Sequence, residues 1–360
     1  MRGEKLKINS GVGISYTKIG YDEDFTEDDL SLTKSYLDKF ATRNLSFNTT
    51  LHYKFSNRLN LRAGLINKQI HYKFYRLSAE HDGEPMEEKL NSRGNTSTQQ
   101  AFAQWQYKPT NELSFNAGLH YLRMAHNNTS SAEPRFSAKW NINNRSSMAA
   151  GYGLHSQVQT LNVYFAQQQL PNGNVLMSNR NLDLTKSHHY VLSYSYRLAK
   201  NMQLKTELYY QRLFNVPVAT DDSSTLSAIN IEYDYITDPL VNKGKGRNYG
   251  IEISLERYLH NNFYLTLSNS FYQSKYTATD GVERNTRFNG NYIITFITGK
   301  EFINERKSKV IGVNIKTIYA GGLRTTPIDL AASRQAGYTV FKEKEAYSLQ
   351  NPAYFRTICG

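Results

Sequence analysis

Apolar and polar residues alternate with a period of two along much of the chain, most clearly in residues 188–214. From Tyr190 to Leu198 every second position is apolar or aromatic, and the pattern resumes with Leu204 and Tyr210 after a short break. Side chains of a β-strand point alternately to opposite faces of the sheet. The segment is therefore predicted to be a β-hairpin with one apolar face and one polar face.

The same alternation recurs from one end of the chain to the other, and no segment shows the 3.6-residue period of a capped helix. We predict about fourteen strands, most of them roughly ten residues long. Their ranges are 5–17, 41–55, 59–75, 98–107, 113–124, 132–140, 146–155, 190–198, 204–210, 248–258, 263–276, 286–297, 309–319 and 353–360.

The connections between these strands alternate between short and long. Short ones are predicted at 56–58, 108–112, 141–145, 199–202, 259–262 and 298–308. Long ones are predicted at 18–40, 76–97, 155–186, 215–247 and 320–352, with shorter members at 125–131 and 278–285. In an antiparallel sheet every other connection lies at the same end, so tight turns gather at one end and loops at the other. Outer-membrane barrels have this asymmetry. The predicted fold is all-β, a transmembrane antiparallel β-barrel with its apolar face toward lipid.

The composition agrees with a β protein in which one face of the sheet contacts water. Hydrophobic residues make up 39% of the 360 residues, while the aromatic share is 13%, with 27 Tyr and 17 Phe. The formal charge of +12 comes from bases scattered among strands and turns, so nucleic acid is not an expected partner. A single cysteine, Cys359, excludes an internal disulfide framework. The first sixteen residues contain no apolar signal-peptide segment.

Several stretches resemble TonB-dependent outer-membrane receptors of Bacteroidetes-type bacteria. EPRFSAKWNINNRSSMAAGYGLHSQ at 133–157 is similar to a strand–turn–strand of that family, and KGKGRNYGIEISLERYL at 243–259 is similar to its Asn-Tyr-Gly-Ile-Glu strand entry. NRNLDLTKSHHYVLSYSYRL at 179–198 resembles a strand entry in which the family commonly has Pro-Glu instead of Thr185-Lys186. NPAYFR at 351–356 is similar to the entry of a late barrel strand.

The resemblance implies a barrel of 22 strands around a plug domain. Residues 1–360 are then expected to be a partial barrel domain, without the plug, the signal peptide and the final strands. The implied function is energy-coupled uptake of a scarce nutrient, such as an iron chelate, cobalamin, an oligosaccharide or a peptide. Implied partners are the TonB complex acting through the plug, the nutrient, outer-membrane lipid or lipopolysaccharide, and a surface lipoprotein.

Candidate ligand contacts lie in two aromatic loop stretches, 159–167 and 229–236. Aromatic rings can stack on sugars or aromatic chelators. The candidate ligand-binding residues are Tyr164, Phe165, Tyr233 and Tyr235.

No motif indicates catalysis, so the chain is expected to be neither an enzyme nor a cofactor protein. The acidic run DEDFTEDD at 22–29 lacks the glycine-centred spacing of a calcium loop. His188 and His189 are adjacent and point to opposite faces of a strand, so they cannot share a metal ion.

Two other classes of protein share parts of this pattern. A passive porin or structural outer-membrane barrel would have the same strands without a plug. A soluble β-rich adhesin or carbohydrate-binding module would instead bury Leu204, Leu208, Ile251 and Ile253 in a common core.

Overall fold

The computed structural model describes residues 5–27, 29–79, 85–169, 175–231, 236, 238–304, 306 and 308–360. Most of these residues form one antiparallel sheet of 15 strands. The strands of this sheet are β1 (Leu6–Thr26), β2 (Leu32–Lys54), β3 (Leu59–Ser78), β4 (Glu87–Tyr107), β5 (Leu113–Met124), β6 (Ser130–Asn141), β7 (Ser146–Gln157), β10 (Thr185–Ala199), β11 (Met202–Ala219), β12 (Leu240–His260), β13 (Phe263–Thr277), β14 (Glu283–Asn285), β15 (Tyr292–Asn304), β16 (Lys309–Ala320) and β19 (Tyr354–Cys359).

Smaller elements lie in the connections between these strands. Two pairs of short strands are β8 (Gln167–Gln169) with β9 (Val175–Met177), and β17 (Arg324–Thr325) with β18 (Leu349–Gln350). The helical segments are η1 (Leu161–Phe165), η2 (Ala228–Asn230), α1 (Leu330–Ala336) and η4 (Glu343–Glu345). Among the described residues, no helix has the length and apolarity required to cross a bilayer.

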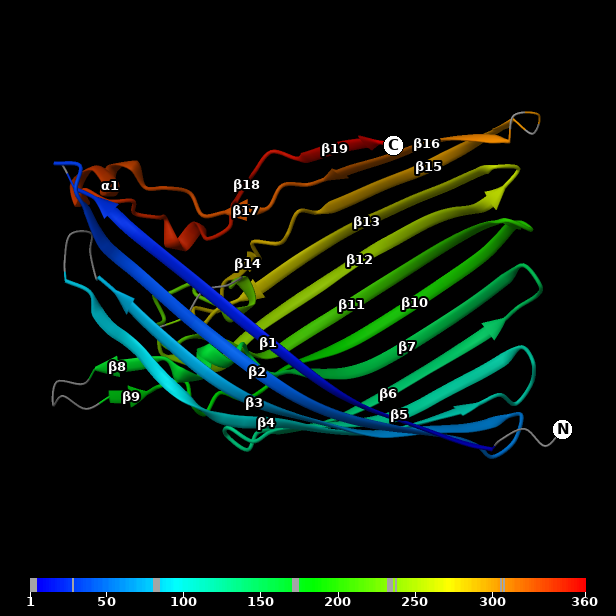
Figure 1. Cartoon of the computed structure of the whole chain (residues 1–360), viewed down its shortest axis with the longest axis horizontal. Coiled ribbons are helices and arrows are strands. Elements are labelled where there is room, and N and C mark those ends of the chain that lie inside the picture. Colours follow the sequence, from blue (N-terminus) through cyan, green and yellow to red (C-terminus); the bar gives the residue numbers. More distant parts are fainter. Residues whose placement is uncertain are drawn as a thin grey trace.

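Fourteen of the fifteen strands of the large sheet pair with one another in chain order (Figure 1). Only β14 leaves this path, because it pairs with the end of β13 alone; the other fourteen strands run in sequence from β1 to β19. Tight turns lie to the right in Figure 1, and the longer connections with their small elements lie to the left. The predicted all-β fold, with its meander of antiparallel strands, is confirmed.

One face of the sheet is apolar and exposed. The strand register places Tyr190 beside Tyr210, and Tyr210 beside Tyr249, in one row across three strands. Leu192 and Leu208 pair in the next row toward the turns, and both are exposed. An exposed apolar surface of this extent, on one face of a β-sheet, is typical of a surface that contacts lipid. We call this face the outer face.

The opposite face is concave and contains the only large hydrophobic cluster of the described residues at the loop end. Phe40 of β2, Leu90 of β4, Phe165 of η1 and Leu240 of β12 are all buried in this one cluster. Strands β2 and β12 are far apart in the order of the sheet, so the sheet must curve for their side chains to meet. We call this concave face the lumen face.

The strands are longer than predicted, and two predicted loops are largely strand. β2 has 23 residues and β1 has 21, so they continue through most of the predicted loop at 18–40. β3 and β4 likewise shorten the predicted loop at 76–97. The alternation of apolar and polar residues ends before the strands do, because both faces of a strand outside the bilayer can be polar. Backbone pairing continues there, to Thr26 opposite Leu32.

Two further predictions at the loop end are corrected. The predicted strand 286–297 begins only at Tyr292, because Thr286 and Asn289 are buried in a hydrogen-bonded turn beside β13. Helix α1 lies within the predicted loop at 320–352, where the side chain of Asp329 accepts hydrogen bonds from the backbone N–H groups of Ala331 and Ala332. Such a cap stabilises the start of a helix by satisfying its free N–H groups. It does not require the 3.6-residue apolar period from which a helix would be predicted.

The two faces predict opposite responses to a new charge. Leu192→Arg places a guanidinium on the outer face and is expected to lower the free energy of unfolding by about 2–4 kcal/mol in a bilayer. Ser193→Arg is the matched control, because Ser193 faces the lumen opposite Glu207. Urea unfolding in phospholipid vesicles measures both. Equal destabilisation by the two variants would contradict the assignment of faces.

Candidate functional site

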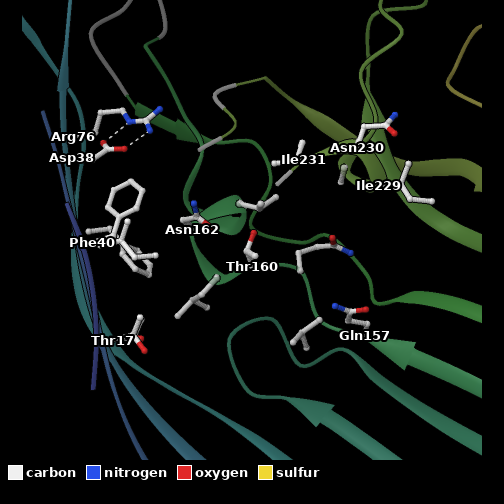
Figure 2. A pocket seen from close by; sticks show the side chains of 18 of the residues that line it. Thr17, Asp38, Phe40, Arg76, Gln157, Thr160, Asn162, Ile229, Asn230 and Ile231 are labelled. Atoms are coloured by element: carbon white, nitrogen blue, oxygen red, sulfur yellow. Dashed lines mark hydrogen bonds and ion pairs between the residues drawn. The ribbon is translucent and has the colours of Figure 1, made fainter. Parts of the chain in front are cut away.

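A cavity of about 1150 Å³ lies at the loop end, between the lumen face of β1–β3 and the segment that follows β7. Figure 2 shows Thr17, Phe40 and the pair of Asp38 and Arg76 along the strand wall. Thr160 and Asn162 project from the facing segment. Polar groups therefore line both sides of the cavity, and the ring of Phe40 lies on the strand wall.

A buried ion pair forms the upper part of the strand wall. Arg76 donates from Nε to Asp38 Oδ1 over 2.7 Å and from Nη2 to Asp38 Oδ2 over 2.5 Å. The hydroxyl of Tyr36 also donates to Asp38 Oδ2, at 2.9 Å, and the guanidinium lies 4.6 Å from the centre of the Tyr36 ring. Two parallel hydrogen bonds and a ring contact fix the guanidinium in one orientation.

The sheet positions this pair through its register. Asp38 of β2 and Arg76 of β3 are directly opposite each other, and Tyr21 of β1 completes the row. The next row toward the membrane contains Phe40 and Phe74, whose ring centres are 5.4 Å apart. Cross-strand neighbours on one face thus provide both the ion pair and the aromatic wall beneath it.

The 3-10 helix η1 rests on that aromatic wall. The ring of Phe165 lies 4.7 Å from Tyr72 and 5.8 Å from Phe74, measured between ring centres. Tyr164 is fully buried, and its oxygen accepts a hydrogen bond from the backbone N–H of Gln159. Burial raises the pKa of Tyr164 to about 12, so its hydroxyl stays neutral.

A second short element completes the facing wall. Ile229 and Asn230 of η2 line the cavity together with Arg287. The side-chain oxygen of Asn230 accepts a hydrogen bond from the backbone N–H of Arg287, which ties η2 to the turn before β15. On the other segment, Gln159 donates from Nε2 to Thr185 Oγ1 over 2.7 Å. These bonds join the β11–β12 connection to the β13–β15 connection and hold the segment after β7 against the start of β10.

The two aromatic stretches chosen from the sequence both border the cavity. Val163 of η1 and Ile231 after η2 line it. The side chains of Tyr164 and Phe165 point from η1 into the hydrophobic cluster, with exposed fractions of 0% and 3%. Residues Tyr233 and Tyr235 lie outside the described residues.

Sequence reasoning missed the strand wall of the cavity. Asp38, Phe40 and Arg76 fell in or beside predicted loops, where side-chain direction could not be assigned. The alternation of Tyr36, Asp38, Phe40 and Thr42 does continue the pattern of β2. Its mixture of acidic, aromatic and hydroxyl side chains has no clear apolar side, so hydropathy does not reveal it.

Residues 22–26 of the acidic run, which lies within the predicted loop at 18–40, are instead the end of β1. Lys34 of β2 forms ion pairs with both Asp22 and Asp24 across the hairpin. Within the described residues, no group of three or more His, Cys, Asp or Glu side chains is arranged to hold a metal ion.

Residues 3–342 match the family model described as TonB dependent receptor-like, beta-barrel. The chain belongs to this family. It is an outer-membrane β-barrel, as predicted. No curated protein matches the sequence.

Solved structures of similar fold include three iron-uptake receptors. The ferric yersiniabactin uptake receptor of Yersinia pestis is 11% identical with a TM-score of 0.64, covering 98% of this chain and 50% of the receptor. The ferric-catecholate import receptor of Escherichia coli K12 is 12% identical with a TM-score of 0.66, covering 98% and 55%. The ferripyoverdine receptor of Pseudomonas aeruginosa is 13% identical with a TM-score of 0.66, covering 98% and 47%. The chain thus spans about half the length of these structures.

Removing one member of the buried ion pair is expected to destabilise the protein. Arg76→Met leaves the Asp38 carboxylate buried without its partner, which costs about 3–5 kcal/mol. The double variant Asp38→Asn, Arg76→Met is expected to recover most of that loss, because no unpaired charge remains. A double-mutant cycle from urea unfolding measures the coupling. Additive effects of the two changes would show that the pair contributes no coupling.

The support of η1 is expected to depend on pH. His126 lies in the connection between β5 and β6, with its ring centre 5.0 Å from that of Phe165. Burial, and secondly the charge of Arg180, lowers the pKa of His126 below its ordinary value of 6.5. The folded state therefore binds the proton less tightly than the unfolded state, and stability is lost as the pH falls below about 6.5.

Hydrogen exchange of peptide 157–166, corrected for the intrinsic rate, is expected to speed up between pH 7.5 and 5. His126→Gln, which cannot take up the proton, is expected to abolish this change. The account fails if the wild type and this variant respond to pH alike.

Proposed function

We propose that the chain forms barrel wall and outer loops of a receptor that takes up a scarce nutrient by TonB-coupled transport. The observation that carries this proposal is the cavity between the lumen face and the loops, in a chain of the TonB-dependent receptor family. A nutrient arriving from outside would meet this cavity before the rest of the lumen.

The cavity offers a defined set of contacts to such a nutrient. Tyr21 and Phe40 supply ring faces for stacking, and Asn162 and Asn230 supply amide groups. Because Asp38 and Arg76 neutralise each other, the wall they form carries little net charge. These groups suit a nutrient with flat or hydroxyl-bearing faces. An iron chelate, cobalamin, an oligosaccharide and a peptide all remain candidates.

The proposed partners follow from the same role. TonB would act on a plug domain in the lumen, and outer-membrane lipid or lipopolysaccharide would cover the outer face. A surface lipoprotein would bind on the outer side of the receptor. Transport of this kind needs no catalytic group, so we assign the chain to the transporters and not to the enzymes.

Filling the cavity tests the proposal. Thr17→Trp places an indole in the cavity and is expected to reduce nutrient-limited growth and uptake at least tenfold while leaving the amount of folded barrel unchanged. Tyr16→Trp is the matched control, because Tyr16 lies on the outer face of the same strand and is 66% exposed. Uptake of labelled ferric siderophore, cobalamin, oligosaccharide and peptide is measured in cells with and without TonB.

Two results would overturn the proposal. Uptake that continues at the same rate without TonB would indicate a passive porin. Uptake that is equal in both Trp variants would show that the cavity is not on the route of the nutrient.

A further inference from the structure

A second hollow in the lumen face lies nearer the turns than the loop-end cavity. Its volume is about 470 Å³. The strand register places six residues in one row across six strands, each directly opposite the next. They are Arg62, Gln104, Gly118, Arg135, Gly153 and His189. Two of the six are glycines, so the row has gaps on both sides of Arg135.

The gap at Gly153 is occupied by an imidazole. A Cβ atom added at Gly153 would lie 2.6 Å from Nε2 of His155, which is closer than real Cβ atoms approach such a neighbour. The ring of His155 is also 4.5 Å from the ring of His189, measured between centres. Glycine at this position therefore lets two imidazoles gather beside Arg135.

The charged side chains that line this hollow are all of one sign. They are Arg62 and Arg135, which lie beside the imidazoles, and no Asp or Glu is among the described lining residues. The one carboxylate nearby, Glu133, is 1% exposed and lies below the surface of the hollow. His52 and Lys7 extend the same row beyond Arg62, and Lys7 adds a further positive charge.

Glu133 holds the site in position. It accepts hydrogen bonds from Arg135 Nη2 at 2.8 Å, from the backbone N–H of Ser156 at 3.1 Å and from the Ser156 hydroxyl. His120 Nδ1 lies 2.9 Å from the same carboxylate. Arg135 therefore has a fixed guanidinium that remains 45% exposed to the hollow.

Three side chains of the hollow, Arg62, His155 and His189, have no carboxylate partner among the described residues. Arg62 forms no hydrogen bond or ion pair among the described residues, and its guanidinium lies 5.7 Å from the centre of the Phe102 ring. His155 and His189 contact each other through their rings, and neither imidazole has a hydrogen-bond partner in the described part of the chain. Guanidinium and imidazole N–H groups that converge on one space bind oxyanions through charge-assisted hydrogen bonds.

We propose that this hollow is an oxyanion-binding site, in which Arg62, Arg135, His155 and His189 hold a carboxylate or phosphate group. The bound carboxylate or phosphate can come from either of two sources. One is a free anionic solute in the lumen, and the other is an acidic side chain of a protein segment that enters the lumen. The site is separate from the loop-end cavity, and the proposal does not rest on the proposed uptake function.

Binding of inorganic phosphate to the detergent-solubilised, full-length protein tests the first source. The double variant Arg62→Gln, His189→Gln is expected to weaken phosphate binding by about tenfold or more, as judged by titration calorimetry. Gly153→Ala is expected to weaken it as well, because the added methyl displaces His155 while all charges remain. The matched control is Lys139→Gln, a cation on the lumen face of β6 outside the hollow, and it is expected to leave binding unchanged.

Charge reversal tests the second source. If a protein carboxylate occupies the site, Arg62→Glu is expected to lower the midpoint of thermal unfolding and Lys139→Glu is not, and the wild type then shows no phosphate binding. Either pattern supports an oxyanion site and identifies its occupant. The proposal is overturned if phosphate binding falls equally in the Lys139 control. It is also overturned if neither phosphate binding nor a selective effect of Arg62→Glu is found.

Discussion

The structure depends on one constraint, which is that every backbone N–H and C=O group inside a bilayer needs a partner within the protein. A meander of antiparallel strands meets this requirement strand by strand, because each pair is joined by a short turn and bonds along its whole length. The pairing then assigns alternate residues to two solvents. Tyr190, Leu192 and Leu208 meet lipid, whereas Arg62, Glu207 and His189 face the lumen. The position of both cavities on the lumen face follows from this division between lipid-facing and lumen-facing residues.

Alternation predicted the strands well where the two faces meet different solvents. The hairpin of β10 and β11 was predicted to within two residues at its turn, where the apolar positions meet lipid, but both strands extend beyond the predicted ranges at the loop end. The loop-end parts of β1 and β2 were not predicted as strand. Asp22, Lys34 and Asp38 lie there, in a region where both faces of the sheet can be polar. Backbone pairing, which hydropathy does not detect, is what extends these strands beyond the membrane.

The candidate site was predictable only in its location. The aromatic loop stretches near η1 and η2 lie at the end of the sheet that contains the cavity, but sequence could not show that Phe165 packs against Tyr72 and Phe74. Nor could it pair Asp38 with Arg76, which are 38 residues apart and meet only through the register of β2 and β3. The row from Arg62 to His189 is likewise a product of register, since its members come from six strands.

The most direct test of this account is the environment of successive residues in β10. Nitroxide labels at positions 192, 193 and 194, in a variant in which Cys359 is replaced by serine, report access to oxygen from lipid and to a nickel chelate from water. The account predicts high oxygen access at 192 and 194 and high nickel access at 193. Labels that all report water, or that all report a buried protein core, would contradict a lipid-facing sheet.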